Sequence, residues 1–277
     1  MGIDLIQYRI CIGCFNRSRL ICSHTKVALG AVSLNLLFLF TVISLLVILS
    51  GDVEIDPGSN EKCKNLSICH VNIRSLSRSK LLAIQLSLAN VYDIITISET
   101  HLHQGVGNDV FELKGYHDIL RRDRGAQGGG IAMFVKENIT FKRLYKCDKQ
   151  DLEAMWVSIN TIGGKILLCC CYRPPDRRDF WDKIDTCIEE VKNDHAGSIF
   201  VLGDLNADFN IPNGNKLQNL CQQQNLAYLV SSPTRITNST ATVLDQILTN
   251  SLKLVQQVNV TPPISSNDHC TISALLN

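Results

Sequence analysis

The chain has 277 residues, of which 45% are hydrophobic and 19% are charged, and its formal net charge is +1. This composition is typical of globular proteins and excludes collagen-like, coiled-coil and largely disordered chains. A charge so close to zero also argues against a nucleic-acid binder held by bulk electrostatics, so any polyanionic partner must be met by a local basic strip.

Residues 1–26 form a basic segment that precedes a long apolar run. The run, Val27–Ser50, is 24 residues long and carries no charge, and a helix of that length, at about 1.5 Å per residue, can cross a bilayer. Cations precede it and carboxylates follow it: Arg9, Arg17, Arg19 and Lys26, then Asp52, Glu54 and Asp56. By the positive-inside rule the remainder of the chain lies across the membrane. We therefore expect residues 27–50 to be a transmembrane or signal helix and the protein to be membrane-associated.

Residues 51–65 are expected to be a linker. The stretch Leu49–Ser59 reads LSGDVEIDPGS and resembles the ribosome-skipping (2A-type) peptides of picornaviruses and some retrotransposons. Asp56 stands where that motif has Asn, and Ser59 stands where it has its last Pro, so the segment is similar to a degenerate copy. If the apolar segment is removed or not inserted, we expect the protein in the nucleus.

From about Lys62 onward, strand and helix patterns alternate over about 210 residues, enough for one buried core. Short apolar, often β-branched runs predict strands at Leu66–Ile73, Asp93–Ser98, Ile131–Val135, Met155–Ile159, Ile166–Cys171, Ile199–Leu202, Val243–Thr249 and Cys270–Leu275. Capping and turn residues precede helical patterns at Lys80–Ala89, Phe180–Val191 and Asn215–Gln224. This order predicts an α/β fold for residues 66–277: a four-layer sandwich of two mainly antiparallel sheets flanked by helices, preceded by the hydrophobic helix.

The twelve cysteines do not follow a disulfide or zinc pattern. Cys169–Cys171 are consecutive within an apolar run, where neighbouring side chains point to opposite faces of a strand. Cys11 and Cys14 have no second pair at zinc-site spacing. We expect most of these cysteines to be buried thiols that act as small hydrophobic side chains.

Polar side chains stand at the ends of the predicted strands. Strand ends meet at one edge of a sheet, where residues far apart in the sequence can converge on one site. The residues concerned are Asn72, Glu99, Tyr172, Arg173, Asp204, Asn206, Asp245, Asp268 and His269.

Taken in order, the motifs at these positions resemble the endonuclease/exonuclease/phosphatase family. This family of metal-dependent phosphoesterases includes AP endonucleases, DNase I-like nucleases and the endonuclease domains of LINE-type non-LTR retrotransposons. The matching segments are NIRS at 72–75, SET at 98–100, YRPP at 172–175, GDLNAD at 203–208, PTR at 233–235, LDQI at 244–247 and NDH at 267–269. RRDR at 121–124 and GGG at 128–130 are most similar to the retrotransposon branch. Asn267 stands where the family usually has Ser.

The resemblance implies a DNase I-like fold and a magnesium-dependent endonuclease that nicks DNA. A hard cation such as Mg²⁺, or Mn²⁺ in its place, prefers oxygen ligands and takes few carboxylates in proteins. Glu99 is the expected ligand, with Asn72 and Asp268 beside the ion. No organic cofactor is expected.

Phosphodiester cleavage also needs a positioned water and proton donors to the developing charge. Asp204 is expected to orient or deprotonate the water. His269, with its charged form favoured by Asp245, is expected to donate to a phosphate oxygen. Tyr172 and Asn206 are expected to donate to non-bridging oxygens.

Four arginines are candidates for binding the DNA phosphate backbone: Arg121, Arg124, Arg173 and Arg235. Gly128–Gly130 would let the backbone approach a phosphate closely or turn a hairpin. The residues alone fit an ordinary charged hairpin loop equally well, and only the resemblance favours DNA.

Two other functions stay open at this point. A phosphatase or phosphodiesterase that acts on lipid or inositol headgroups would suit a membrane segment. A catalytically decayed relic would keep the fold without the activity.

Overall fold

The computed structural model describes residues 65–125, 128–208 and 215–277. Glu61–Asn277 form one compact unit. The predictions for the basic segment, for Val27–Ser50 and for the 2A-like stretch lie outside the described residues. Within the part that is described, no helix has the length and apolar character needed to span a bilayer.

Two six-stranded sheets form the framework. The first has the order β13-β14-β1-β2-β4-β3 and the second has the order β5-β6-β7-β8-β12-β9, with a separate hairpin β10-β11. Within each sheet one neighbouring pair, β1-β2 or β7-β8, is parallel and the others are antiparallel. The strands are β1 (Leu66–Asn72), β2 (Ile94–Ser98), β3 (Leu120–Arg122), β4 (Ile131–Val135), β5 (Phe141–Arg143), β6 (Ala154–Thr161), β7 (Gly164–Tyr172), β8 (Ser198–Asp204), β9 (Ala227–Tyr228), β10 (Arg235–Ile236), β11 (Ala241–Thr242), β12 (Asp245–Thr249), β13 (Val255–Thr261) and β14 (Thr271–Leu276).

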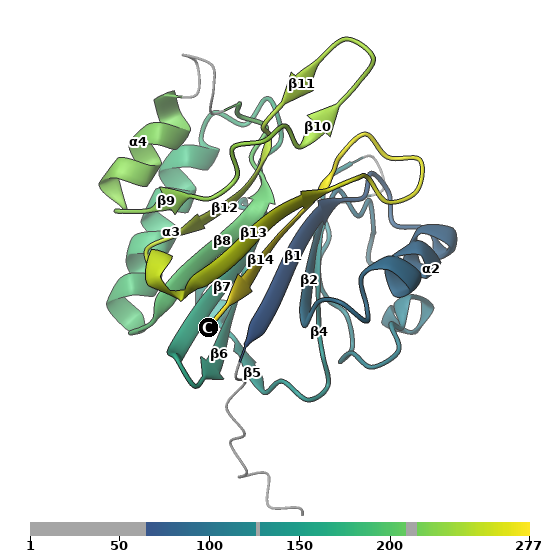
Figure 1. Cartoon of the computed structure of the whole chain (residues 1–277), viewed down its shortest axis with the longest axis horizontal. Coiled ribbons are helices and arrows are strands. Elements are labelled where there is room, and N and C mark those ends of the chain that lie inside the picture. Colours follow the sequence, from purple (N-terminus) through teal and green to yellow (C-terminus); the bar gives the residue numbers. More distant parts are fainter. Residues whose placement is uncertain (1–64, 126–127, 209–214) are drawn as a thin grey trace, which may run out of the picture. The chain divides into compact units, whose positions relative to one another are not determined.

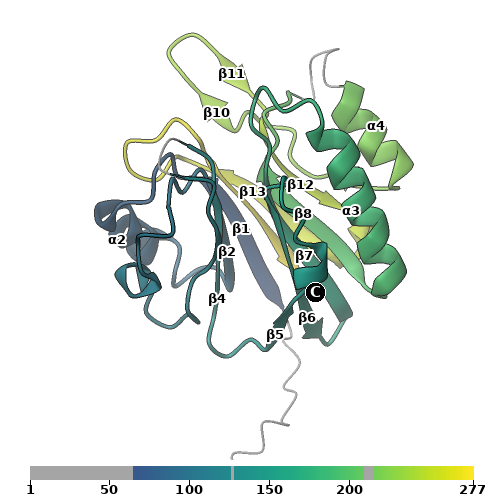
Figure 2. The ribbon, with the colours of Figure 1, turned by 180° about the vertical axis from the view of Figure 1, so that it is seen from behind.

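The helices lie on the two outer faces of this pair of sheets. Figures 1 and 2 show α2 (Arg78–Ser87) beside the first sheet, and α3 (Phe180–Asp194) and α4 (Asn215–Gln223) beside the second. Three buried clusters match this layering: one between the sheets, one between the second sheet and α3 with α4, and one between the first sheet and α2. The mixed α/β architecture with two facing sheets agrees with the prediction.

Strand alternation explains the run of cysteines in β7. Leu168 and Cys170 belong to the cluster between the sheets, whereas Leu167, Cys169 and Cys171 belong to the cluster beneath α3. All three thiols are fully buried. The cysteines among the described residues are buried and free, as expected for small hydrophobic side chains.

The predicted elements match most of the observed ones, but edge strands were missed. Ser77 is the N-cap of α2, because its side chain accepts a hydrogen bond from the amide of Lys80. β13 was not predicted because its polar, half-exposed sequence VQQVNVT lacks a clean alternation, and the pairing shifts between Val255 and Gln257. β3, β5 and the strands of the hairpin are too short to give a periodic signal.

Candidate active site

Three of the predicted site residues are cross-strand neighbours in the second sheet. Asp204 ends β8, and the register pairs it with Tyr172 on one side and with Asp245 on the other. Tyr172, Asp204 and Asp245 are all buried. The order β7-β8-β12 therefore brings together groups that are far apart in the sequence.

The first sheet brings Asn72 and Glu99 to the same place. Asn72 pairs with Ser98 in the parallel register of β1 and β2, and Glu99 follows directly. The Asn72 amide donates to Glu99 Oε1 and to Asp204 Oδ2, each at 2.9 Å. The Tyr172 hydroxyl donates to Glu99 Oε1 at 3.0 Å. Asn72 therefore joins carboxylates that belong to different sheets.

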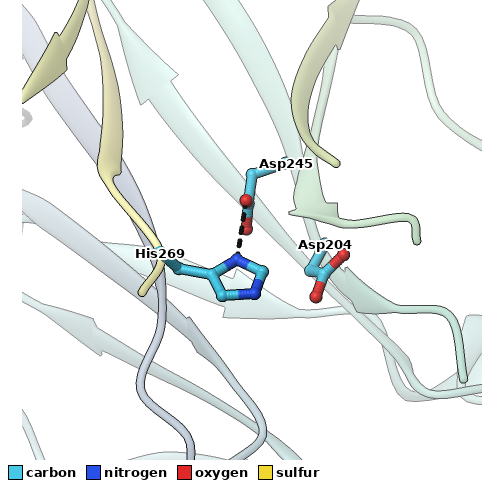
Figure 3. Close-up of side chains that lie close together, drawn as sticks. All are labelled: Asp204, Asp245 and His269. Carbon is cyan, nitrogen blue, oxygen red and sulfur yellow. Dashed lines mark hydrogen bonds and ion pairs between the residues drawn. The ribbon is translucent and has the colours of Figure 1, made fainter. Parts of the chain in front are cut away.

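His269 completes the cluster from the segment that leads into β14. Its Nδ1 donates to Oδ2 of Asp245 at 2.9 Å, and the carboxylate of Asp204 lies on the side of the other ring nitrogen (Figure 3). One side-chain atom from each of Asp204, Asp245 and His269 lies within 4.8 Å of the others. Oδ1 of Asp245 is buried and has no hydrogen-bond partner among the described residues.

Burial and neighbouring charges shift the protonation of these groups. Burial, together with the charge of Asp245, raises the pKa of Asp204 to about 7. Burial lowers the pKa of His269, but its hydrogen bond to Asp245 and the nearby carboxylates outweigh this, so the net pKa is raised. Burial, and then the charge of Glu99, raises the pKa of Tyr172, which keeps its hydroxyl protonated. The site thus holds a carboxyl that titrates near neutral pH beside two proton donors.

Strained backbone gathers at the same strand ends. Arg74, Glu99, His101 and Asn206 are non-glycine residues with φ of 46°, 54°, 54° and 44°. Such conformations cost roughly 1–3 kcal/mol each and persist where the surroundings enforce them. The amide of Asn206 donates to Oδ1 of Asp204, and its side chain donates to the carbonyl of Arg173. Asn206 therefore orders the loop after β8.

Asp268 is placed differently from Glu99 and Asn72. Arg235 Nε lies 2.9 Å from its Oδ2, and Arg74 Nη1 lies 3.9 Å from its Oδ1. Burial acts against ionisation, but Arg235 outweighs it and lowers the pKa of Asp268. Asp268 is thus held by arginines at the rim and is not one of the carboxylates that Asn72 joins.

The four predicted phosphate-binding arginines are largely engaged by the protein itself. Arg121 donates to the carbonyl of Val106 and lies 3.4 Å from Asp123, with its side chain only 14% exposed. Arg173 donates to the carbonyls of Leu205, Asn206 and Pro175. Arg124 pairs with Glu153 and Arg235 pairs with Asp268. Contacts with groups distant in the sequence thus turn these guanidinium groups toward the protein, which the sequence could not show.

Three residues around the site were not among the predicted site residues. Arg74 projects from the strained turn after β1 and is 69% exposed. His70 is fully buried, with Nε2 3.9 Å from Oδ1 of Asp245. Asn267, in the place of the family's Ser, donates to the carbonyl of Asn72 and accepts from the amide of Asp268. A histidine within the apolar run Leu66–Ile73 is the sequence signal that could have identified His70.

The donor set suits a hard divalent cation. Its carboxylate oxygens are the ligands that Mg²⁺ and Mn²⁺ prefer, whereas the imidazole of His269 is more typical of softer metals. The unpartnered oxygen of Asp245 points to a missing electropositive neighbour. Among the His, Cys, Asp and Glu side chains of the described residues, Asp204, Asp245 and His269 lie close enough together to hold an ion. The sequence predicted Glu99, Asn72 and Asp268 as ligands.

Solved structures of endonuclease/exonuclease/phosphatase enzymes share this fold of two facing sheets. The endonuclease domain of TRAS1, a telomere-specific non-LTR retrotransposon, matches with a TM-score of 0.63 and 17% identity, over 77% of this chain and 98% of that one. The 3′ phosphatase NExo from Neisseria, bound to a product DNA hairpin, matches with a TM-score of 0.60 and 15% identity, over 76% and 99%. An AP endonuclease from Archaeoglobus fulgidus matches with a TM-score of 0.55 and 15% identity, over 76% and 99%.

Residues 166–273 match a family model described as Endonuclease-reverse transcriptase. No curated protein sequence matches the chain significantly. The family model and the shared fold confirm the resemblance to the endonuclease/exonuclease/phosphatase enzymes, including the retrotransposon endonuclease domains, that the ordered motifs indicate.

Proposed function

We propose that the chain is a divalent-metal-dependent phosphodiesterase of retrotransposon origin that nicks DNA. The observation that carries the proposal is a pair of side-chain hydrogen bonds between the sheets. Asn72 of the first sheet donates to Asp204 of the second, and His269, which leads into the first, donates to Asp245 of the second. These side chains meet only when both sheets are folded against each other, as expected of groups that act together in one reaction.

Mg²⁺, or Mn²⁺ in its place, is the proposed cofactor. Glu99 would hold it from the first sheet, with Asp204 and Asp245 supplying further oxygens. Asn72, whose amide donates to Glu99 and Asp204, would orient those two carboxylates, and Asp268 stands at the rim. The ion would neutralise charge on the phosphate.

The side chains then share the proton chemistry. Asp204, whose pKa lies near neutrality, would orient the attacking water and take its proton. His269, protonated and oriented by Asp245, would donate to a phosphate oxygen as charge develops. The Tyr172 hydroxyl would donate to a non-bridging oxygen while remaining close to Glu99.

DNA is the substrate that the comparisons favour. NExo was solved with a DNA product, and the TRAS1 domain is an endonuclease. In this chain the Arg74 side chain at the rim of the site is 69% exposed and lies 3.9 Å from Asp268, whereas Arg124 and Arg235 are 40% and 39% exposed and pair more closely, at 3.0 and 2.9 Å. Arg74 would meet a backbone phosphate, a contact that positions DNA without reading its sequence.

A second candidate is removal of a phosphate from a DNA 3′ end. The observation that favours it is the similarity to NExo, which is described as a 3′ phosphatase. Both activities break a bond to phosphorus and use the same kinds of groups.

A substrate panel distinguishes these functions. The full chain is incubated in Mg²⁺, and in parallel in EDTA, with supercoiled plasmid, a 3′-phosphorylated DNA hairpin and a soluble phosphoinositide. We expect Mg²⁺-dependent conversion of plasmid to open circles. Headgroup turnover without nicking would instead establish the lipid phosphatase alternative, and a folded protein inactive on all three substrates would establish the relic.

Membrane association through Val27–Ser50 is a separate proposal that rests on the sequence. Translation in vitro with microsomes tests it, because Asn65, Asn138 and Asn238 begin glycosylation sequons. Glycosylated full-length protein would support insertion, two products separated near Gly58 would indicate skipping, and an unshifted band would contradict both.

A further inference from the structure

Glu153, immediately before β6, contacts three segments next to the site. Its side chain is only 12% exposed, and its Oε1 accepts from Arg124 Nη1 at 3.0 Å. Its Oε2 accepts from the amide of Gly130 at 2.5 Å. Its own carbonyl accepts from the amide of Tyr172 at 2.9 Å. Burial raises the pKa of the Glu153 carboxyl although Gly130 and Arg124 oppose this, so its placement is energetically costly.

The first arm of these contacts leads through the glycine loop to Glu99. Gly129 and Gly130 have φ of +66° and +83°, and a Cβ on Gly130 would lie 2.5 Å from Oγ1 of Thr100. Their carbonyls accept from the amides of His101, at 2.9 Å, and Thr100, at 3.1 Å. These bonds hold the segment in which Glu99 and His101 adopt the left-handed conformation. Only glycines fit so close to this strained turn.

The second arm leads through Arg124 and Tyr172 to the same carboxylate. The guanidinium of Arg124 donates to the carbonyl of Gly128 at 3.0 Å and lies 5.7 Å from the centre of the Tyr172 ring. The Tyr172 hydroxyl in turn donates to Glu99 Oε1. Both arms therefore start at Glu153 and end at Glu99.

We propose that Glu153 is a positioning residue that fixes Glu99, and with it the metal-binding edge of the site, through the glycine loop and the Arg124–Tyr172 stack. The proposal rests on the proposed function, in which Glu99 holds the divalent ion. It also gives Arg124 a structural task in place of the phosphate contact predicted from the sequence. Groups behind a metal ligand that set its orientation commonly change metal affinity by about 10–100-fold when removed.

Mn²⁺ binding to the full chain tests this inference. Electron paramagnetic resonance measures free Mn²⁺ for the parent, Glu153→Ala, Glu153→Gln and a control, Glu190→Gln. Glu190 is a matched control because its carboxylate also pairs with a cation, Lys149, at 2.6 Å, but it lies on α3. We expect Mn²⁺ affinity to fall about 10–100-fold in Glu153→Ala and less in Glu153→Gln, which keeps an acceptor for Gly130. DNA binding by the Glu153 variants, measured in EDTA, should equal that of the parent. The Mn²⁺ affinity of Glu190→Gln should also equal that of the parent.

Amide hydrogen exchange in metal-free protein separates failure of this inference from failure of the proposed function. A parent that binds no Mn²⁺ would defeat the metal-dependent function, and exchange at Thr100 and His101 would then decide the role of Glu153. Faster exchange at these two amides in folded Glu153→Gln supports the positioning role. Parent-like Mn²⁺ affinity in both folded Glu153→Gln and folded Glu153→Ala overturns it. If the parent binds no Mn²⁺, unchanged protection of the Thr100 and His101 amides in Glu153→Gln overturns it.

Discussion

The imidazole of His269 donates through Nδ1 to Oδ2 of Asp245 over 2.9 Å, and both side chains are buried. Asp245 therefore fixes the ring so that Nε2 faces the interior of the site. A carboxylate in this position favours the charged imidazole and holds one orientation of it.

Asp245→Asn should lower the cleavage rate by about 10²–10⁴ with little change in KM, because an amide neither stabilises the imidazolium nor fixes its proton. Single-turnover kinetics on plasmid DNA measures this. Asp118→Asn is the control, because Asp118 is exposed and lies away from the site. It stands two residues after Tyr116, which forms a β-bridge with Lys136 just beyond the end of β4 that is farther from Ser98. Equal loss in both variants would contradict a specific role for Asp245.

Asp204→Asn should change how stability depends on pH. Its folded pKa of about 7 lies above the unfolded value of 3.8, so the folded state binds more protons in this interval. The contribution of Asp204 therefore lowers the free energy of unfolding as the pH rises from about 4 to about 7. Urea unfolding in EDTA should show Asp204→Asn gaining stability relative to the parent across this range. A constant difference between the two proteins would refute the shifted pKa.

His70→Gln should show the opposite trend. Burial lowers the pKa of His70 from 6.5 to about 4, so the unfolded state binds the proton first as the solution is acidified. The parent therefore loses stability through this group as the pH falls from about 6.5 to about 4. Glutamine keeps a polar group facing Thr96 and Ser98 and does not titrate, so the same unfolding series should show a smaller acid loss. An acid loss as large as that of the parent would contradict burial of a neutral imidazole.

Arg74→Ala should weaken DNA binding and reduce its salt dependence. Each phosphate contact contributes a slope of about −0.9 to the plot of log K against log salt for duplex DNA. We expect the slope to become shallower by about that amount, measured by fluorescence anisotropy in EDTA. Lys165→Ala is the control, because Lys165 is exposed near the start of β7, at the end opposite Tyr172. An unchanged slope in Arg74→Ala would remove Arg74 from the DNA-binding surface.

The sequence was sufficient to predict the positions of residues that stand at the ends of strands. Asn72, Glu99, Tyr172, Asp204 and Asp245 stand at or just after strand ends, and parallel or antiparallel register brings such ends together. The alternation of apolar side chains predicted the central strands for the same reason. These features depend on backbone geometry, which the local sequence largely determines.

The arginines and Glu153 could not be placed because contacts distant in the sequence decide where their side chains point. Arg121 and Arg173 appear in the sequence as exposed cations, but hydrogen bonds to distant carbonyls turn them toward the protein. Glu153 looks like an ordinary polar residue before an apolar strand. Its partners Arg124 and Gly130 lie more than twenty residues away, and no local pattern connects them.

The central claim is that groups from both sheets act as one metal-dependent site, and a double-mutant cycle on plasmid nicking tests it most directly. Single-turnover rates are measured in saturating Mg²⁺ for the parent, Glu99→Gln, His269→Gln and the double variant. We predict that each single change lowers the rate by at least about 10² and that the double variant is scarcely slower than either, because residues that act as a unit are strongly non-additive. A folded parent without Mg²⁺-dependent nicking, or losses that multiply fully in the double variant, would contradict the claim.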